Sequence, residues 1–365
     1  ANTTGTENTA VGKDALKANT TANGVTAVGE AALMANTTGA SNTAVGEGAL
    51  TTNTTGTRNT ATGNAALNAA TTGDDNTGLG YFALVSATTA SDNTAVGSSA
   101  MENTTTGHSN VAVGFEVLKQ NTTGSENTAM GYQALDAATT ADNNVAIGRL
   151  AGTGLTTGGS NTIVGAAAMQ TNSTGVGNVA IGISALAVAQ GSDNVAVGRT
   201  SGDAVTTGAN NVLMGTDAGG SLTTGGNNVS IGKDSLSQQT EAANNTAVGY
   251  KAGSGNTSGF YFTAIGAYAG ENHTTGEGNT VVGYEAGHDL TTGGGNVAFG
   301  FRSLDGNSTG SSNIAIGNNA LGGASNAANH NLAVGVSAGL AITTGTQNTY
   351  IGNFCSDGAS AGNNN

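Results

Sequence analysis

The sequence predicts an all-β protein: a single elongated β-solenoid (a β-roll or β-helix) of about 21 coils with a 17-residue repeat. Three observations predict this fold class. A glycine recurs every 17 residues, a short phrase rich in β-branched residues precedes each of these glycines, and a second turn signal follows in most repeats. A repeat with one strand and two turns is typical of solenoids, in which each coil hydrogen-bonds to its neighbours.

The spacing of the recurring glycine holds along the whole sequence. Of its 20 intervals, 18 are 17 residues long, one is 16 and one is 18. We therefore expect one repeat domain over residues 1–365, with a partial coil at 1–7 and coils over 8–364. A one-residue deletion falls near 183–197 and a one-residue insertion near 318–334. At about 4.8 Å per coil, 21 coils would extend roughly 100 Å.

The repeat can be written N-T/V-A-V/I-G-x-x-A-L-x-x-N-T-T-G-x-x, with its positions numbered 1 to 17. Positions 2 to 4 favour an extended strand, and the glycines at positions 5 and 15 favour turns. Asn at position 1 is predicted to form a ladder of stacked amides that hydrogen-bond from coil to coil. The predicted ladder residues are Asn8, Asn42, Asn59, Asn76, Asn93, Asn110, Asn127, Asn144, Asn161 and Asn178.

Positions 9 and 12 vary together, which predicts how the interior is filled. Position 9 is usually Leu, but where it becomes Gly, position 12 often becomes aliphatic, as in Gly152 with Leu155. One interior cavity per coil, filled from either position, explains this exchange, because protein cores are close-packed. Gly270 with His273 breaks the rule, as does Gly253 with Asn256, so we expect looser packing there.

Position 3 is usually Ala, but it is larger and apolar in several coils, as at Ile163 and Tyr350. Positions 2 and 4 share one strand face and position 3 has the other. A strand that is apolar on both faces is usually buried on both. One face is expected to fill the coil and the other to contact a second chain or another wall of the coil.

Neither end of the sequence shows a charged or amphipathic cap, so a neighbouring molecule is expected to cover the ends.

Composition excludes several partners. The net charge is −14 with nine Lys plus Arg, so no basic patch for nucleic acid is expected. No apolar run is long enough to insert into a membrane. The single cysteine, Cys355, rules out an internal disulfide framework and is interpreted as a small core residue.

We predict no catalytic residue, no metal ligand and no cofactor, and hence a protein that is not an enzyme. Acidic residues occupy no fixed repeat position, and the four histidines (His108, His273, His288 and His330) lack the spacing of metal ligands. Gly-x-Gly matches carry no weight where glycine marks every turn.

One stretch, Tyr250–Gly270, concentrates aromatic residues. These rings either stack on a sugar or subunit, or fill a locally widened core. The candidate interface or ligand aromatics are Tyr250, Phe260, Tyr261, Phe262 and Tyr268.

Positions 12 to 14 read Asn-Thr-Thr in several coils. The paired threonines would form hydroxyl columns, which makes an ice-binding solenoid one alternative. The same tripeptides, at Asn19, Asn36, Asn53 and Asn121, also match the acceptor motif for N-glycosylation on exposed turns.

The stretch NTAMGYQAL at Asn127–Leu135, and its relatives along the chain, resembles the head repeats of trimeric autotransporter adhesins and the repeats of phage-type tail fibres and bacterial fibre proteins. The resemblance implies a coiled rod, often trimeric, that adheres or acts as a spacer. The 17-residue coil is longer than the usual head repeat, and no heptad stalk or barrel anchor is seen.

The expected function is therefore structural: a subunit or shaft of an extracellular fibre that assembles with itself, end to end or as a homo-oligomer. The first alternative is an adhesin or tail-fibre-type rod of fixed length that binds a surface or glycan. The second is ice binding. The expected location is extracellular, at a cell surface or in a virion fibre.

Overall fold

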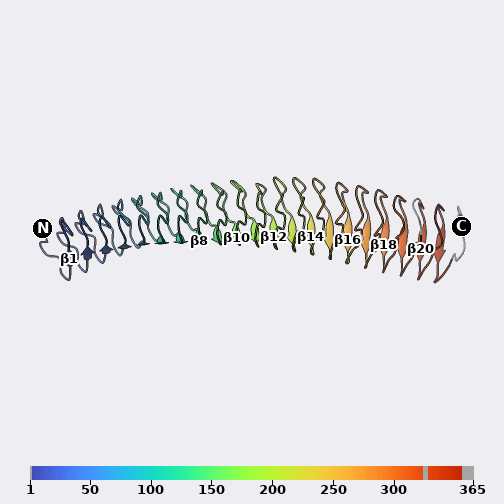
Figure 1. The fold of residues 1–365 in the computed structure, drawn as a ribbon, viewed down its shortest axis with the longest axis horizontal. Helices are drawn as coiled ribbons and strands as arrows, with labels where there is room; N and C mark the ends of the chain where they lie inside the picture. The colour runs from blue at the N-terminus through green and yellow to red at the C-terminus, as the bar shows by residue number, and fades with distance from the viewer. Residues whose placement is uncertain (1, 324–327, 356–365) are drawn as a thin grey trace. The chain divides into compact units, whose positions relative to one another are not determined.

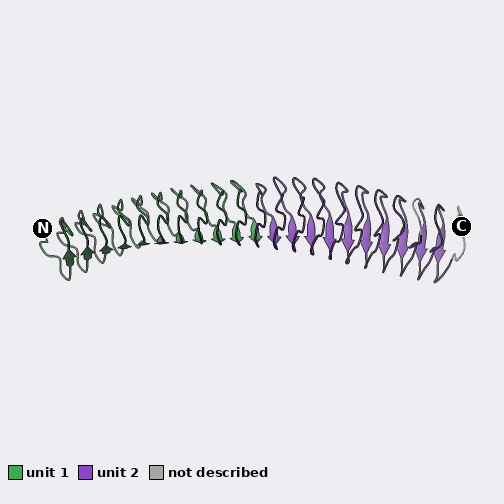
Figure 2. Ribbon diagram, viewed as in Figure 1, with its two compact units in different colours: residues 1–180 green, residues 181–365 purple. Residues whose placement is uncertain are grey.

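The computed structural model describes residues 2–323 and 328–355, and within them the chain folds as an all-β parallel solenoid with no helix. The chain divides into two compact units, Ala1–Ala180 and Ile181–Asn365 (Figure 2). Each coil contributes one three-residue strand followed by turns (Figure 1). The predicted fold class is therefore confirmed.

The strands carry the phrase predicted to be extended. Those of unit 1 are β1 (Thr9–Val11), β2 (Thr26–Val28), β3 (Thr43–Val45), β4 (Thr60–Thr62), β5 (Thr77–Leu79), β6 (Thr94–Val96), β7 (Val111–Val113), β8 (Thr128–Met130), β9 (Val145–Ile147) and β10 (Thr162–Val164). Strand β11 (Val179–Ile181) spans the division between the units. Those of unit 2 are β12 (Val195–Val197), β13 (Val212–Met214), β14 (Val229–Ile231), β15 (Thr246–Val248), β16 (Thr263–Ile265), β17 (Thr280–Val282), β18 (Val297–Phe299), β19 (Ile314–Ile316), β20 (Leu332–Val334) and β21 (Thr349–Ile351).

Within each unit, every strand pairs in parallel with the next strand along the chain. In unit 1 the pairs run from β1 to β10, and in unit 2 from β12 to β21. Partners occupy the same repeat position, as Ala44 and Ala61 do. The turns are joined in the same way: the Leu33 N–H donates to the Ala49 carbonyl at 3.0 Å and the Thr37 N–H to the Thr54 carbonyl at 2.9 Å. Hydrogen bonds between coils thus continue beyond the strands.

The glycine at position 5 is required by two features of its site. At Gly148 the backbone φ is +138°, a region that L side chains rarely adopt. A Cβ atom there would also lie 2.6 Å from the carbonyl oxygen of Gly165, the equivalent residue of the next coil. Because this approach recurs between successive coils, the glycine recurs with it.

The rest of the winding depends on residues in the left-handed region that are not glycine. In one coil of unit 1, Gln133, Leu135 and Asn143, at positions 7, 9 and 17, have φ values of +51°, +51° and +60°. The same three positions recur with positive φ in other coils. Such a conformation costs about 1–2 kcal/mol for an ordinary residue, so packing and hydrogen bonds must offset it in each coil. This conformation was not predicted from the repeat pattern.

Position 3 faces the interior of the coil, while positions 2 and 4 face outward. Ala44, Ala95 and Ala146 at position 3 are completely buried. In β9, the flanking Val145 and Ile147 are exposed. Of the two expected faces, the one formed by position 3 fills the coil, and the outward face has no other wall of the coil packed against it in the described residues.

The predicted exchange between positions 9 and 12 is confirmed. Leu155 at position 12 is fully buried beside Gly152. A Cβ atom on Gly152 would lie 2.8 Å from Ile163 Cδ1 and 2.9 Å from Leu135 Cδ2, so there is no unfilled space at the glycine. One interior volume per coil is filled from either side.

The expectation of looser packing around Gly253 and Gly270 is wrong. The ring of Phe262 occupies the space, and a Cβ atom would lie 2.8 Å from it at Gly253 and 2.4 Å from it at Gly270. Phe262 is fully buried and stacks on His273, with 4.1 Å between ring centroids and 5° between ring planes. A large ring at position 1 thus replaces the aliphatic side chains that other coils place in the interior.

Candidate functional site

The Asn residues at position 1 form a buried ladder in which each amide is shared between coils. The Asn76 N–H donates to Asn59 Oδ1 at 3.0 Å, and Asn76 Nδ2 donates to the same oxygen at 3.0 Å. Asn76 Nδ2 also donates to the Ala90 carbonyl of its own coil at 2.8 Å. Among the predicted ladder residues, Asn8 is partly exposed and the other nine are buried, namely Asn42, Asn59, Asn76, Asn93, Asn110, Asn127, Asn144, Asn161 and Asn178. The ladder is structural, because both ends of each buried amide are used inside the protein.

A second set of buried asparagines occupies position 12, where the glycosylation motif was noted. Asn53 Nδ2 donates to Asn36 Oδ1 at 2.8 Å and to the Gly56 carbonyl at 3.0 Å. Asn19, Asn36, Asn53 and Asn121 are all fully buried. A glycan cannot be attached to a buried amide nitrogen in the folded protein, so these motifs are parts of the fold.

The hydroxyl groups that motivated the ice-binding alternative are used internally at position 13. Thr37 Oγ1 donates to the Thr54 carbonyl at 2.9 Å, and Thr54 Oγ1 donates to the Thr71 carbonyl at 3.0 Å. The same bond recurs along both units, as at Thr122 and Thr274. The position 13 column is therefore part of the bonding between coils, and only the threonines at position 14, such as the exposed Thr38 and Thr55, are left for an ice-binding surface.

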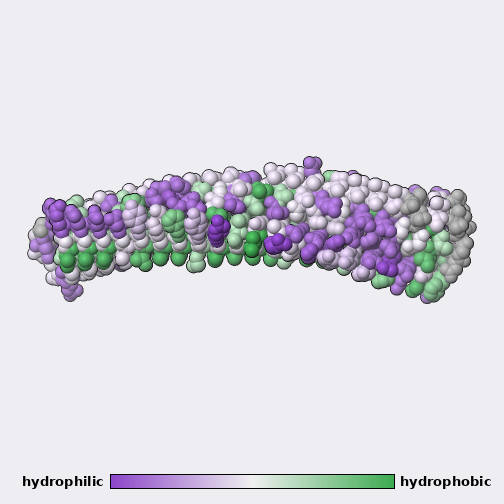
Figure 3. Space-filling view, in the orientation of Figure 1, coloured by the Kyte–Doolittle hydropathy of each residue, from purple (hydrophilic) through white to green (hydrophobic). Residues whose placement is uncertain are grey.

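The outward face of the strands is a regular surface feature that recurs in every strand. Positions 2 and 4 carry Thr, Val, Ile, Leu, Met or Phe in every strand and no charged residue in any of them. A row of hydrophobic residues follows the strands of unit 1 in Figure 3. The most exposed large side chains on this face are Val11, Val45, Leu79, Val111, Met130, Val145 and Ile147 in unit 1, and Ile181, Met214, Ile265, Val297, Phe299, Ile314, Ile316 and Ile351 in unit 2. We call this surface the outward strand face.

The five candidate aromatics do not form one site. Phe262 is buried in the core, so it cannot contact a partner or ligand. Phe260 is partly buried, whereas Tyr261 is 64% exposed, and their rings are 6.4 Å apart and tilted. Tyr250 and Tyr268 meet edge to face with 5.2 Å between centroids.

Tyr250 and Tyr268 belong instead to a longer row of rings. Tyr268 lies 5.9 Å from Tyr284, which stacks on Phe301 at 5.5 Å. We call Tyr250, Tyr268, Tyr284 and Phe301 the aromatic row. Its last two members lie outside the aromatic-rich stretch of the sequence. The preference of aromatics for position 6 was the signal that could have found them.

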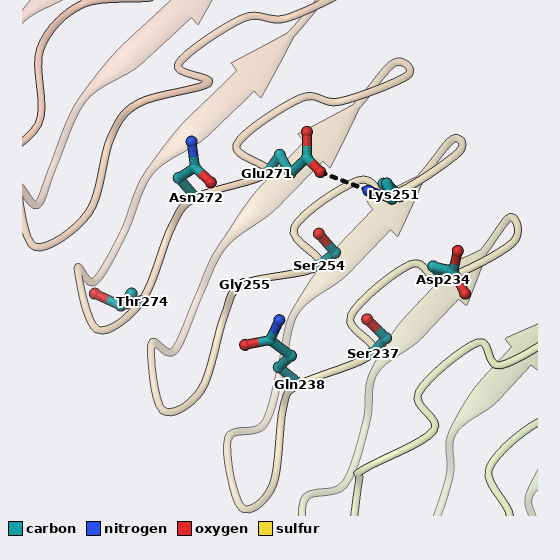
Figure 4. A pocket seen from close by; sticks show the side chains of 9 residues that line it. All are labelled: Asp234, Ser237, Gln238, Lys251, Ser254, Gly255, Glu271, Asn272 and Thr274. Carbon is teal, nitrogen blue, oxygen red and sulfur yellow. Dashed lines mark hydrogen bonds and ion pairs between the residues drawn. The ribbon is translucent and has the colours of Figure 1, made fainter.

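A polar groove lies near the first rings of the aromatic row in unit 2. Side chains from successive turns point along it in Figure 4: Asp234, Ser237, Gln238, Lys251, Ser254, Glu271, Asn272 and Thr274, with Gly255 between them. Lys251 Nζ pairs with Glu271 Oε1 at 3.0 Å and lies 5.9 Å from the centroid of the Tyr250 ring. The hydrogen bond to Glu271 raises the pKa of Lys251, so this amine stays charged. The groove thus combines amides, hydroxyls and a fixed charge with nearby rings.

Cys355 and His273, both noted in the sequence, make contacts within the fold. Cys355 packs against the buried core of unit 2, and its thiol donates to the Gly352 carbonyl at 2.9 Å. His273 is buried, and its Nε2 lies 3.2 Å from Asn279 Nδ2. Phe262 has no side-chain oxygen that could accept from Asn279 Nδ2, as an asparagine at position 1 would. His273 Nε2 accepts in its place, so the imidazole is neutral.

Searches of protein-family models, curated proteins and solved structures each returned no match. No helix that could cross a membrane occurs among the described residues. The fold and the ladder define the class: the chain is a β-solenoid repeat protein with a 17-residue coil and asparagine ladders. The resemblance to adhesin heads and tail fibres remains one of sequence phrase.

The ladder predicts a stability effect that is specific to buried asparagine. Asn127→Ala removes an acceptor from the Asn144 N–H and Nδ2 groups and a donor from the Ala141 carbonyl. Leaving buried polar groups unpaired should destabilise the protein by about 1–3 kcal/mol. Urea unfolding measures the loss. The exposed Asn64→Ala is the matched control and should change stability by less than about 0.5 kcal/mol; equal effects of the two changes would refute the structural role.

The buried His273 predicts a loss of stability in mild acid. Burial lowers the pKa of His273 to about 4 from 6.5. The unfolded chain therefore binds a proton at this histidine at a higher pH than the folded chain does. The contribution of neutral His273 to the free energy of unfolding is complete above pH 6.5 and is lost as the pH falls toward 4. The loss should be on the order of 3 kcal/mol.

Unfolding midpoints measured between pH 7 and pH 4 test this. His273→Asn places at this site the residue that Asn256 provides one coil earlier, and it should flatten the pH dependence relative to the unaltered protein. An unchanged slope in the variant would show that other groups dominate acid sensitivity.

Proposed function

We propose that the protein is a non-catalytic structural subunit, the shaft of an extracellular fibre that assembles with itself. The observation that carries this proposal is the outward strand face, which is regular and free of charge in every strand and carries an apolar side chain at position 4 in every strand except β4, with Thr at position 2 in many of them. Solvent-facing sheet surfaces normally carry polar side chains. A column of exposed apolar side chains repeated at the coil spacing is best covered by a partner with the same spacing.

The size of the face supports a stable contact. Ten coils at about 4.8 Å, with a strand of three residues about 10 Å wide, give unit 1 alone an outward face of roughly 500 Å², of which the position 4 column supplies most of the apolar part. Monomeric proteins rarely expose contiguous apolar patches above a few hundred Å². Two such patches packed together approach the roughly 1,200 Å² at the lower end of specific interfaces.

Charge supports a second copy as the partner. The chain carries −14, yet neither position 2 nor position 4 holds a charged residue, so two copies can meet at this face without bringing like charges together. Charged residues do occur at position 6, beside the face, as at Lys13 and Glu30, which pair across coils at 3.0 Å. An extracellular location, at a cell surface or in a virion fibre, rests on the resemblance of the repeat phrase and forms part of the proposal.

A second candidate function is glycan binding by a rod of fixed length. The polar groove and the aromatic row of unit 2 favour it, because sugars are bound by ring faces together with planar amides and carboxylates. Tyr250 is partly exposed and lies next to Lys251, which lines the groove. Rings and hydrogen-bonding groups thus lie within reach of one ligand.

The fibre proposal predicts that charge on the outward strand face prevents assembly. Val145→Lys with Ile147→Lys in unit 1, combined with Ile314→Lys and Ile316→Lys in unit 2, should convert large assemblies to monomers. Sedimentation velocity and electron microscopy of dilute protein measure this. Thr123→Lys with Thr140→Lys places two lysines on exposed turns as a matched control for the unit 1 pair and should leave assembly intact. Monomers of the unaltered protein at micromolar concentration would refute the proposal.

The glycan alternative predicts saturable binding on a glycan array, with at least a tenfold loss in Tyr250→Ala combined with Glu271→Gln. Tyr81→Ala is the control, since Tyr81 is an exposed ring in unit 1, far along the sequence from the groove. Binding that survives the groove variant, or no binding at all, would exclude this site as a sugar receptor.

A further inference from the structure

Three successive coils of unit 2 place titratable side chains in one column at position 10: Glu271, His288 and Asp305. Asp289 follows His288 at position 11. His288 Nδ1 lies 2.8 Å from Asp289 Oδ1 and 3.9 Å from Asp305 Oδ1. On the other side of the ring, His288 Nε2 lies 3.2 Å from Glu271 Oε2. The imidazole is therefore flanked by carboxylates at both nitrogens.

We propose that His288, Asp289 and Asp305 form a binding site for a divalent transition-metal ion of the zinc class. One donor atom from each residue lies within 4.8 Å of the donor atoms of the other two. Among the described residues, this is the group of at least three His, Cys, Asp or Glu side chains whose donor atoms lie this close together. Ligands at about 2.0–2.2 Å from a tetrahedral zinc ion lie roughly 3.2–3.6 Å apart. The observed separations lie on either side of this range, so small side-chain rotations suffice.

The protonation of the ring supports a cation at Nδ1. When Glu271 accepts the Nε2–H, a neutral imidazole has only a lone pair at Nδ1, and that lone pair faces the lone pairs of Asp289 and Asp305. In the other neutral tautomer Nδ1–H donates to Asp289 Oδ1, and the Nε2 lone pair then faces Glu271 Oε2. A neutral ring therefore leaves one nitrogen lone pair facing a carboxylate in either tautomer, and a metal ion at Nδ1 removes that opposition. A histidine that binds a metal through one ring nitrogen commonly donates the N–H of the other to a carboxylate.

Among the described residues no lysine or arginine forms an ion pair with Asp289 or Asp305, and Asp289 Oδ1 accepts a hydrogen bond from Asn272 Nδ2 at 3.2 Å. Lys251 pairs with Glu271 at 3.0 Å, and the Arg302 guanidinium pairs with Glu285. Asp305 is partly buried and its carboxylate lies close to that of Asp289, so the two charges repel each other. A divalent ion would relieve this repulsion. It would join three side chains from two adjacent coils, with water filling the remaining position.

The donor set selects the class of ion. An imidazole nitrogen with two carboxylates suits Zn²⁺, Co²⁺ or Mn²⁺, whereas Ca²⁺ and Mg²⁺ prefer oxygen ligands alone. The inference is independent of the proposed fibre function, because it concerns three side chains away from the outward strand face. It reverses the expectation from sequence that the histidines bind no metal. The donors come together only through the coil spacing.

The test uses the full chain freed of metal with a chelator and titrated with Zn²⁺ by calorimetry in millimolar Mg²⁺, which occupies weak acidic sites. One Zn²⁺ per chain should bind, and the unfolding temperature should rise with it. His288→Asn and Asp289→Asn should each weaken binding at least tenfold. Asp289 is mostly exposed, so its variant should fold. Glu271→Gln should weaken binding 10- to 100-fold through the orientation of the ring.

His330→Asn is the matched control, since His330 is exposed and lies outside the cluster. It should bind Zn²⁺ like the unaltered protein. The proposal is overturned if no saturable binding occurs, or if binding persists unchanged in His288→Asn. Absence of binding together with a doubly protonated His288 ring in an NMR titration would identify the proton as the cation at Nδ1. Loss of binding in the control as strong as in His288→Asn would place the ion elsewhere.

Discussion

Main-chain hydrogen bonding between consecutive coils is the constraint on which the rest of the structure depends. Strands pair only with the preceding and following strand within a unit, and turns bond in the same direction. Each coil must therefore follow the path of its neighbour around its whole circumference. That requirement explains the recurring glycine, whose hydrogen atom points at the next coil's carbonyl. It also explains why leucines and polar residues adopt the left-handed region in register, at positions where an isolated turn would avoid it.

Much of this arrangement could be predicted from the sequence, because the copies of the repeat can be compared with one another. The spacing of Gly12, Gly29 and their successors revealed the coil length, and the constancy of asparagine at position 1 indicated a ladder. The exchange at Gly152 and Leu155 revealed a shared interior volume. Each of these features recurs in many coils, so its physical cause could be inferred from what stays constant.

Other features could not be predicted. They depend on which face of the strand points inward, or on residues that occur in a single coil. Alternation shows that positions 2 and 4 share a face, but it does not say which face is interior when both are apolar. Phe262 with His273 occurs once, so no second copy indicated that the two rings stack. The groove and the aromatic row bring together residues from different coils, and their types differ from coil to coil. The chemistry of this protein thus lies where the repeats differ, and its architecture where they agree.

The unequal coil between β19 and β20 has a consequence for how such a chain changes over time. These strands pair at an offset of 18 residues, yet Ala315 still opposes Ala333, and Asn331 Nδ2 still donates to Asn313 Oδ1 at 3.1 Å. The additional residue is absorbed within one coil and does not propagate, as expected when each repeat contacts only its neighbours. The addition or deletion of a whole repeat can therefore leave the flanking coils in register. The number of coils can vary between generations far more readily than the cross-section of any one of them.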